Sequence, residues 1–232
     1  MFFQDEEHSR TAPPNKVRSE RTGCVYESQG VLGMGAFGTV FRARDITNDK
    51  TVAIKSIKSI GMGETEIQLM TNISDIKSVV KLLDYCTDLS FGGINYYLVM
   101  DFADGDLEFF VDELCDENDG NGYLQKNTDL RRYAAMLISG VQHLHENKII
   151  HRDLKPGNVL RFESDYGDYV LKISDFGISK KLEETINAGT TNVGTKRYMA
   201  PEVAISQEKY TTKVDVRSLG LLLFYLVTGR HR

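Results

Sequence analysis

Apolar residues recur at helical spacing in two stretches of this chain. Between residues 130 and 146 they are Leu130, Tyr133, Ala134, Leu137, Ile138, Val141 and Leu144. The shorter stretch, 64–73, has them at Ile67, Leu69, Met70 and Ile73. Spacings of three and four residues put these side chains on one face, so both stretches predict amphipathic helices. The apolar run Leu219–Val227 predicts a third, buried helix over 214–227.

Short β-rich runs separated by turn residues dominate the first hundred positions. Residues 39–43 and 51–55 flank the turn residues 48–50, which predicts a hairpin. Further strands are expected at 79–85, 94–102, 158–162 and 169–173. The pattern predicts a small, mostly antiparallel sheet with one helix, followed by a mainly helical part that begins near 103–106.

Two segments follow neither period. Residues 1–22 are polar and contain Pro13-Pro14, so we expect them to be disordered, with regular structure beginning near Tyr26. Residues 114–129 are acidic and interrupted by glycine, which predicts a loop.

Composition narrows the class of protein. The 232 residues, 41% of them hydrophobic, suffice for one two-lobed domain, and the net charge of −5 argues against nucleic acid or a membrane as a partner. Three widely spaced cysteines without a CxxC pair indicate neither a zinc site nor a disulfide framework. The acidic N-terminus is unlike a signal peptide, and the run Leu219–Val227 is too short to span a bilayer. We therefore expect a cytoplasmic location, with the nucleus also open.

The strongest chemical signal is a pair of short motifs. Residues 151–158 read His-Arg-Asp-Leu-Lys-Pro-Gly-Asn, and Asp175-Phe176-Gly177 follows closely. Together they supply two carboxylates, an amide and a lysine. Phosphoryl transfer to a hydroxyl needs a carboxylate to orient the nucleophile, oxygen ligands for magnesium and a cation for the moving charge. The motifs match the catalytic loop and metal-binding turn of protein kinases, so the chain resembles that family.

A glycine-rich loop strengthens this resemblance. Residues 33–40 read Gly-Met-Gly-Ala-Phe-Gly-Thr-Val, and glycines let a backbone approach phosphates closely. A lone G-x-G-x-x-G could equally open a dinucleotide-binding unit, but a strand pattern follows it here instead of a helix. Lys55 ends Val-Ala-Ile-Lys, where the family has its phosphate-holding lysine. Glu66, on the predicted inward face of helix 64–73, is the expected partner of Lys55, and Glu64 is the competitor.

The resemblance implies a role for each matching residue. Asp153 orients the substrate hydroxyl, Lys155 neutralises the transferred phosphoryl group, and Lys55 with Glu66 completes the catalytic set. Asn158 and Asp175 are the expected ligands of Mg²⁺. The expected ATP contacts are Leu32, Gly33, Met34, Gly35, Ala36, Phe37, Gly38, Thr39, Val40, Ala53, Lys55, Asp101, Ala103 and Leu160. The resemblance also implies Met100 as gatekeeper, an internal spine of Met70, Leu82, His151 and Phe176, and Asp215 as the anchor of the catalytic-loop backbone.

Two further features indicate the substrate and its control. Lys155 and the segment 194–202 are typical of serine/threonine kinases, so the expected partner is a protein substrate, which makes a small-molecule kinase less consistent with the chain. Thr195 is expected to contact Asp153 and Lys155. Thr191 lies where the family often carries a regulatory phosphothreonine, which Arg152 would bind. An upstream kinase acting on Thr191 is the regulatory partner that this implies.

The chain also departs from the family pattern. Arg217 stands where a tryptophan is usual, and we expect it to reach solvent or to find a partner such as Glu202. The sequence ends at Arg232, before the last helices usual in the family, so we expect an exposed apolar patch on helix 214–227.

The expected fold class is α+β, a two-lobed protein-kinase-like fold. Its antiparallel N-lobe spans 23–103 and its mainly helical, incomplete C-lobe spans 104–232, after the tail 1–22. The expected function is an ATP- and Mg²⁺-dependent serine/threonine protein kinase in phosphorylation-based signalling. The alternative is a non-catalytic kinase-like module that binds nucleotide or a partner.

Overall fold

A computed structural model describes most of the chain. The described residues are 14–35, 38–58, 61–73, 76–90, 93–117, 130–164, 167–181, 195, 197–200, 203 and 211–230. They form two compact units: the first includes residues up to 72 together with 81–102, and the second includes 73–80 and the residues from 103 onward. The chain therefore passes from the first unit into the second at residues 73–80 and then returns to the first unit at residue 81.

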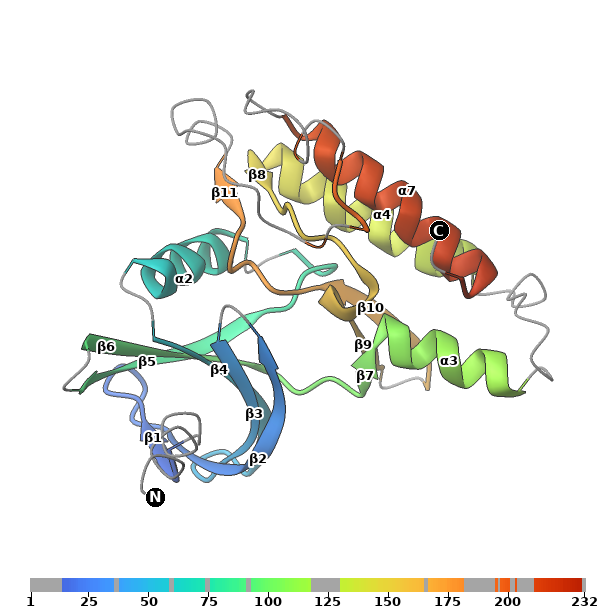
Figure 1. Cartoon of the computed structure of the whole chain (residues 1–232). Coiled ribbons are helices and arrows are strands. Elements are labelled where there is room, and N and C mark those ends of the chain that lie inside the picture. Colours follow the sequence, from blue (N-terminus) through green and yellow to red (C-terminus); the bar gives the residue numbers. More distant parts are fainter. Residues whose placement is uncertain are drawn as a thin grey trace, which may run out of the picture. The chain divides into compact units, whose positions relative to one another are not determined.

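The described residues of the first unit form an antiparallel sheet and the helix α2 (Figure 1). The strand order is β1-β2-β3-β4-β6-β5. The elements are β1 (Lys16–Arg18), β2 (Val25–Gly35), β3 (Gly38–Asp45), β4 (Lys50–Ile57), α2 (Met62–Asn72), β5 (Leu82–Ser90) and β6 (Gly93–Asp101). The expected hairpin is β3–β4, in which Val40 lies opposite Lys55. Alternating side chains of the sheet bury an apolar core of Val17, Tyr26, Phe41, Ala43, Val52, Ile54, Cys86, Tyr97 and Val99.

The expectation that residues 1–22 are disordered is wrong for residues 14–22. Val17 of β1 lies opposite Tyr26 of β2 and is buried in the core of the sheet. Beyond β1, the turn is fixed by backbone hydrogen bonds from Ser19 N to Cys24 O (2.9 Å) and from Gly23 N to Ser19 O (2.9 Å). The polar composition suggested a disordered tail. One buried valine and a closed turn instead hold residues 14–22 against the sheet.

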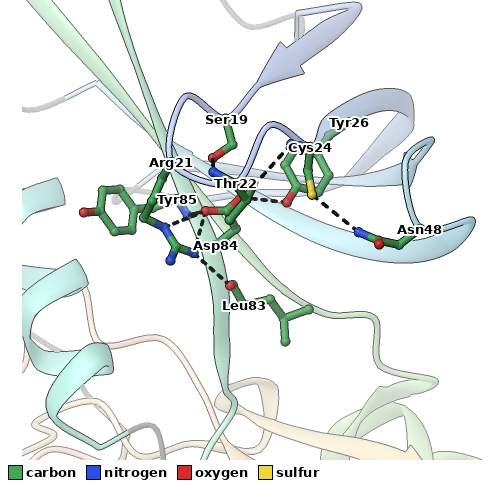
Figure 2. Close-up of polar contacts among 9 residues, drawn as sticks. All are labelled: Ser19, Arg21, Thr22, Cys24, Tyr26, Asn48, Leu83, Asp84 and Tyr85. Carbon is green, nitrogen blue, oxygen red and sulfur yellow. Dashed lines mark hydrogen bonds and ion pairs between the residues drawn. The ribbon is translucent and has the colours of Figure 1, made fainter.

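A buried carboxylate, Asp84 of β5, holds this turn (Figure 2). Arg21 donates to Asp84 Oδ1 from Nε (3.0 Å) and from Nη2 (2.8 Å). Thr22 Oγ1 and Tyr26 OH donate to Oδ2 over 2.5 and 2.9 Å. Arg21 also lies over the ring of Tyr85, with Cζ 5.5 Å from its centroid. Because the turn follows β1, and β1 and β5 are the two outer strands of the sheet order, the bonds from Arg21 and Thr22 link the two ends of that order.

Helix α2 begins two residues before the predicted stretch 64–73 and ends at Asn72. It packs against β5 and β6. A Cβ on Gly63 would lie 2.3 Å from the ring of Tyr96, so only glycine permits this close approach of helix to strand. Tyr96 OH then donates to Glu64 over 2.9 Å. The first turn of the helix is therefore seated on β6.

In its described residues, the second unit combines the helices α3, α4 and α7 with short strands (Figure 1). Its elements are β7 (Gly105–Asp106), α3 (Leu107–Glu117), α4 (Leu130–Glu146), β8 (Ile149–Ile150), η2 (Pro156–Asn158), β9 (Val159–Glu163), β10 (Tyr169–Ile173), β11 (Lys180–Lys181) and α7 (Lys213–Thr228). Strands pair as β10-β9-β7 and β11-β8. Helices α4 and α7 lie side by side, and α4 also packs on β10. Helix α4 has the bounds that its apolar stripe predicted.

Helix α3 was not predicted, and the loop expected over 114–129 overlaps its end. The reason is visible locally: Asp106 caps the helix by accepting a hydrogen bond from Phe109 N (2.9 Å). Leu107, Phe110 and Val111 follow at helical spacing and are buried. The acidic residues that favoured a loop follow this stripe, and 118–129 lie outside the described residues.

Helix α7 exposes part of its apolar surface, as expected. Val216 is 57% exposed, Phe224 42% and Val227 37%, whereas Leu222, Tyr225 and Leu226 are buried. Arg217 is exposed, so its charge reaches solvent; Glu202 lies outside the described residues. Among the helices described, none combines the length and apolarity needed to cross a bilayer.

Candidate active site

A buried ion pair occupies the first unit. Lys55, on β4, places Nζ 2.7 Å from Oε1 and 2.8 Å from Oε2 of Glu66, on α2. Both side chains are buried, at 6% and 2% exposure. Of the two candidate glutamates, the structure thus pairs Glu66 with the lysine, while Glu64 accepts from Tyr96 OH. The helix begins early enough for Glu66 to reach Lys55 although only eleven positions separate them.

The three motif glycines differ in what the fold requires of them. Gly38 has φ +142°, and a Cβ there would lie 2.2 Å from Ser56 O of the neighbouring strand. Among the residues that the structure describes, a Cβ on Gly33 would have no neighbour within 4 Å, and one on Gly35 would meet only Gly38 O, at 4.0 Å. Gly38 is therefore needed by the sheet itself, whereas Gly33 and Gly35 leave open space along the backbone. Open backbone of this kind suits the close approach of phosphate oxygens.

The remaining expected nucleotide contacts of the first unit lie on four strands. Leu32 and Met34 of β2 are exposed, Val40 and Thr39 belong to β3, and Ala53 lies on β4 opposite Met100. Asp101 ends β6 and pairs with Lys50 over 2.8 Å. Ala36 and Phe37 lie outside the described residues. Ala103 and Leu160 belong to the second unit, and their joint role with the others stays a prediction.

Asp153 is the centre of the polar cluster in the second unit. Its Oδ1 accepts from Thr195 N (2.7 Å) and Thr195 Oγ1 (2.8 Å). Its Oδ2 accepts from Asn158 Nδ2 (3.0 Å) and lies 2.9 Å from Lys155 Nζ. Four donors thus hold a carboxylate that is only 5% exposed in one orientation. A base that must meet a substrate hydroxyl requires such fixed geometry.

Asn158 and Asp175 are brought to the same end of one hairpin. Val159 lies opposite Ile173 at the last pair of β9 and β10, so Asn158 and Ser174 come next on each strand. Ser174 donates to Asn158 O from N (2.9 Å) and from Oγ (3.0 Å). Asp175 then follows directly after Ser174. The hairpin therefore brings an amide and a carboxylate together at one end.

The donor chemistry of these two residues fits magnesium. Asn158 Nδ2 donates to Asp153 O (2.8 Å) as well as to Oδ2, which leaves the amide oxygen Oδ1 as the atom for a cation. Mg²⁺ prefers oxygen ligands and commonly takes one or two carboxylates, with substrate phosphates and water completing its shell. Asn158 and Asp175 could supply the protein's share of such a shell.

Backbone strain accompanies the polar cluster around Asp153. Arg152, immediately before Asp153, has φ +71°, and Asp175 has φ +62°. Such left-handed conformations are costly for residues with a Cβ and persist where the surrounding contacts impose them. At Arg152 the contact is with Asp215, which is fully buried: Oδ1 accepts from Arg152 N and Oδ2 from His151 N, both over 2.9 Å. Asp215 thus anchors the loop backbone, as the resemblance implied.

Further contacts tie the loop to the segment that follows Asp175. His151 is buried against Phe176, with ring centroids 5.2 Å apart, and its Nε2 lies 2.9 Å from Ser174 O. Arg152 donates to Ile178 O from both Nε (2.5 Å) and Nη2. The arginine expected to bind a phosphothreonine is therefore bonded to backbone here. Thr191 itself lies outside the described residues.

Sequence reasoning did not identify two contributors to this site. His145, in the last turn of α4, places Nε2 2.9 Å from Asp215 Oδ2. Ser174 links Asn158 to His151 through the bonds given above. The only sequence feature that could have pointed to either residue is its position beside a motif. His145 lies shortly before the motif 151–158, and Ser174 lies directly before Asp175. Their partners depend on the tertiary fold.

Comparison with known proteins agrees with this geometry. Residues 26–232 match the protein kinase domain family, and the chain belongs to that family. It is 33% identical to serine/threonine-protein kinase unc-51 of Caenorhabditis elegans, covering 90% of this chain and 24% of that protein. It is 33% identical to cyclin-dependent kinase 7 of Xenopus laevis, covering 87% and 56%. Serine/threonine-protein kinase dst1 of Dictyostelium discoideum is 35% identical over 88% of this chain and 26% of its own length. The chain thus spans between a quarter and just over half of these relatives.

Proposed function

We propose that this chain is a serine/threonine protein kinase that transfers the γ-phosphoryl group of ATP to hydroxyls of a protein substrate. The observation that carries the proposal is the cluster around Asp153, in which Lys155, Asn158 and Thr195 all bond one buried carboxylate. The names of the relatives support the serine/threonine class. The complete set Lys55, Asp153, Asn158 and Asp175 argues against the alternative of a non-catalytic kinase-like module.

The residues divide the work of the transfer. Asp153 orients the substrate hydroxyl and accepts its proton while the hydroxyl oxygen bonds to the γ-phosphorus. The bond from that phosphorus to the β–γ bridging oxygen breaks, and ADP leaves. Lys155 offsets charge on the transferred group, and Lys55, fixed by Glu66, holds the phosphates of ATP. Asn158 and Asp175 would hold Mg²⁺, which supplies charge neutralisation at the phosphate oxygens.

The regulatory partner proposed for this site is an upstream kinase that modifies Thr191. A phosphate there would offer oxygens to Arg152, whose guanidinium now bonds Ile178 O. Replacing Thr191 with alanine should then abolish activation by phosphorylation. If activity of the phosphorylated chain is the same in the variant, this regulatory proposal fails. The location proposed is intracellular, because the cysteines of the sequence are widely spaced and include no CxxC pair.

The proposed activity is tested by phosphate transfer from ATP·Mg to a generic protein substrate. Asp153→Asn should reduce the rate by about 10²–10⁴-fold, since a positioned base contributes that much. Asp112→Asn, an exposed carboxylate on α3, is the matched control and should retain the rate. Equal rates in wild type and Asp153→Asn would contradict the proposal. No transfer by either, with ATP still raising the melting temperature, would favour the binding module.

A further inference from the structure

A hollow of about 210 Å³ lies beside the catalytic loop in the second unit. Its lining residues come from α3, from the loop that carries Lys155, and from the segment bonded to Asp153. They are Glu108, Lys155, Pro156, Gly157, Thr195, Arg197 and Tyr198. Because a water molecule occupies about 30 Å³ in the liquid, the hollow has room for a side chain of a bound peptide.

The hollow is adjacent to the acceptor position of the proposed reaction. Thr195 bonds Asp153 with both N and Oγ1, and Lys155 Nζ lies 2.9 Å from the same carboxylate. Two of the lining residues therefore touch the base directly. A peptide whose hydroxyl reaches Asp153 must place a neighbouring side chain at or near this hollow.

Three of the lining residues are charged, and their charges are engaged to different degrees. Lys155 is paired with Asp153. Glu108 already takes part in an interaction. Arg197 is exposed and makes no hydrogen bond or ion pair with any residue that the structure describes. The charge left for a ligand is accordingly a guanidinium.

Tyr198 places two of these charges in one neighbourhood. Burial raises the pKa of Tyr198 to about 12, and Glu108 adds to this rise while Arg197 opposes it. Both side chains therefore act on the same hydroxyl. If Glu108 were the only charge there, it would repel an anionic side chain that entered the hollow. Arg197, which lies in the same neighbourhood, would attract it.

We propose that this hollow is a specificity subsite that selects protein substrates with an acidic side chain next to the phosphorylated hydroxyl, through Arg197. The planar guanidinium donates to a carboxylate in a fork, which suits such a contact. Gly157 contributes no side chain and Pro156 no charge, so the catalytic loop adds no carboxylate of its own to this lining. The proposal rests on the proposed kinase activity and gives it a substrate class.

The test compares three peptides that share one serine and differ only in its flanking residues, which are glutamate, alanine or lysine. The measured quantity is kcat/KM, and the result is the ratio of the glutamate to the lysine peptide within each variant. A partly exposed ion pair gives a modest effect, so wild type should prefer the glutamate peptide by about fivefold. Taking the ratio within one variant cancels any general loss of activity.

Charge reversal at Arg197 supplies the decisive arm. Arg197→Glu should bring the ratio below one, and Arg197→Gln should bring it close to one. Glu108→Gln is the matched control and should keep or raise the preference for glutamate. Higher salt should lower the preference in wild type without any substitution, because salt screens an exposed pair.

Three outcomes would overturn the proposal. They are a wild-type preference for lysine, equal use of all three peptides, and a ratio that Arg197→Glu leaves unchanged. In each of these the chain still phosphorylates peptides, so the proposed kinase activity stands. If wild type phosphorylates neither the peptides nor a generic protein substrate, the proposed kinase activity and the proposed subsite both fail.

Discussion

Lys55 Nζ bonds both carboxylate oxygens of Glu66, at 2.7 and 2.8 Å, and the pair is almost fully buried. The bond ties β4 to α2 within the first unit. A buried charge without its partner is costly. The charge of Lys55 is therefore stable in the interior only beside Glu66, and the charge of Glu66 only beside Lys55.

Replacing Glu66 with glutamine should therefore affect both stability and activity. The variant leaves Lys55 without a balancing charge, and we expect a loss of about 3 kcal/mol in unfolding free energy. If Lys55 holds phosphates, kcat/KM should also fall by about 100-fold. Thermal unfolding and steady-state kinetics measure the two effects. Glu64→Gln is the control, and an equal loss in that variant would refute the assignment of Glu66.

Gly35 and Gly38 should separate into a position open to a bound nucleotide and a position that the fold itself requires. Gly38→Ala forces a Cβ to within 2.2 Å of Ser56 O and requires φ +142° of an alanine. Backbone strain alone costs about 1–3 kcal/mol, and the clash adds to it. Gly35→Ala should leave the unfolding midpoint unchanged and raise the KM for ATP. Urea unfolding without nucleotide distinguishes them; equal midpoints in the two variants would show that the β3–β4 contact does not require glycine.

The Asp84 cluster should make stability depend on pH. Burial raises the pKa of Asp84, but hydrogen bonds from Thr22, Tyr26, Ser19 and Arg21 outweigh it and lower the pKa below its ordinary value. A carboxyl with a depressed pKa in the folded state stabilises above the unfolded pKa of about 3.9, and this contribution is lost as pH falls further.

Asp84→Asn should consequently lower the unfolding free energy by about 3 kcal/mol at pH 7, with the gap from wild type narrowing below about pH 4. Chemical unfolding across this range measures the gap. Thr22→Val removes a single donor to the same carboxylate and should cost about 1 kcal/mol. A gap that stays constant between pH 7 and pH 3 would be inconsistent with an ionised Asp84 as the centre of this cluster.

Cys24 and Cys86 should differ in reactivity. Burial raises the pKa of Cys86 to about 12, so its thiol is almost fully protonated at pH 8. Cys24 is only half buried and accepts a weak hydrogen bond from Asn48 Nδ2 (3.4 Å). Because the thiolate is the reactive form, iodoacetamide should modify Cys24 at least about tenfold faster than Cys86 in the native protein. Peptide mapping by mass spectrometry gives both rates, and in urea they should converge. Similar native rates would mean that Cys86 is accessible.

The elements predicted well from the sequence are those with a strong local period. The stripe over 130–146 gave helix α4 with its bounds, and the hairpin of β3 and β4 followed from its turn residues. The paired motifs at 151–158 and 175–177 likewise supplied the residues that the structure groups around Asp153 and Asn158. These signals are local because side chains return to the same face of a strand every two residues and of a helix every 3.6 residues. A short motif likewise contains its polar side chains within a few neighbouring positions.

Tertiary contacts decided the rest. Burial of Val17 in the core holds the N-terminal segment in the sheet as a strand. Asp84 accepts hydrogen bonds from Arg21, which lies 63 positions away in the sequence. The choice between Glu64 and Glu66 depended on whether Tyr96 or Lys55 lay opposite each side chain. A sequence pattern reports which residues can share a face of their own element. Which partner a polar side chain meets depends on distant strands and helices, and those are placed only when the chain has folded.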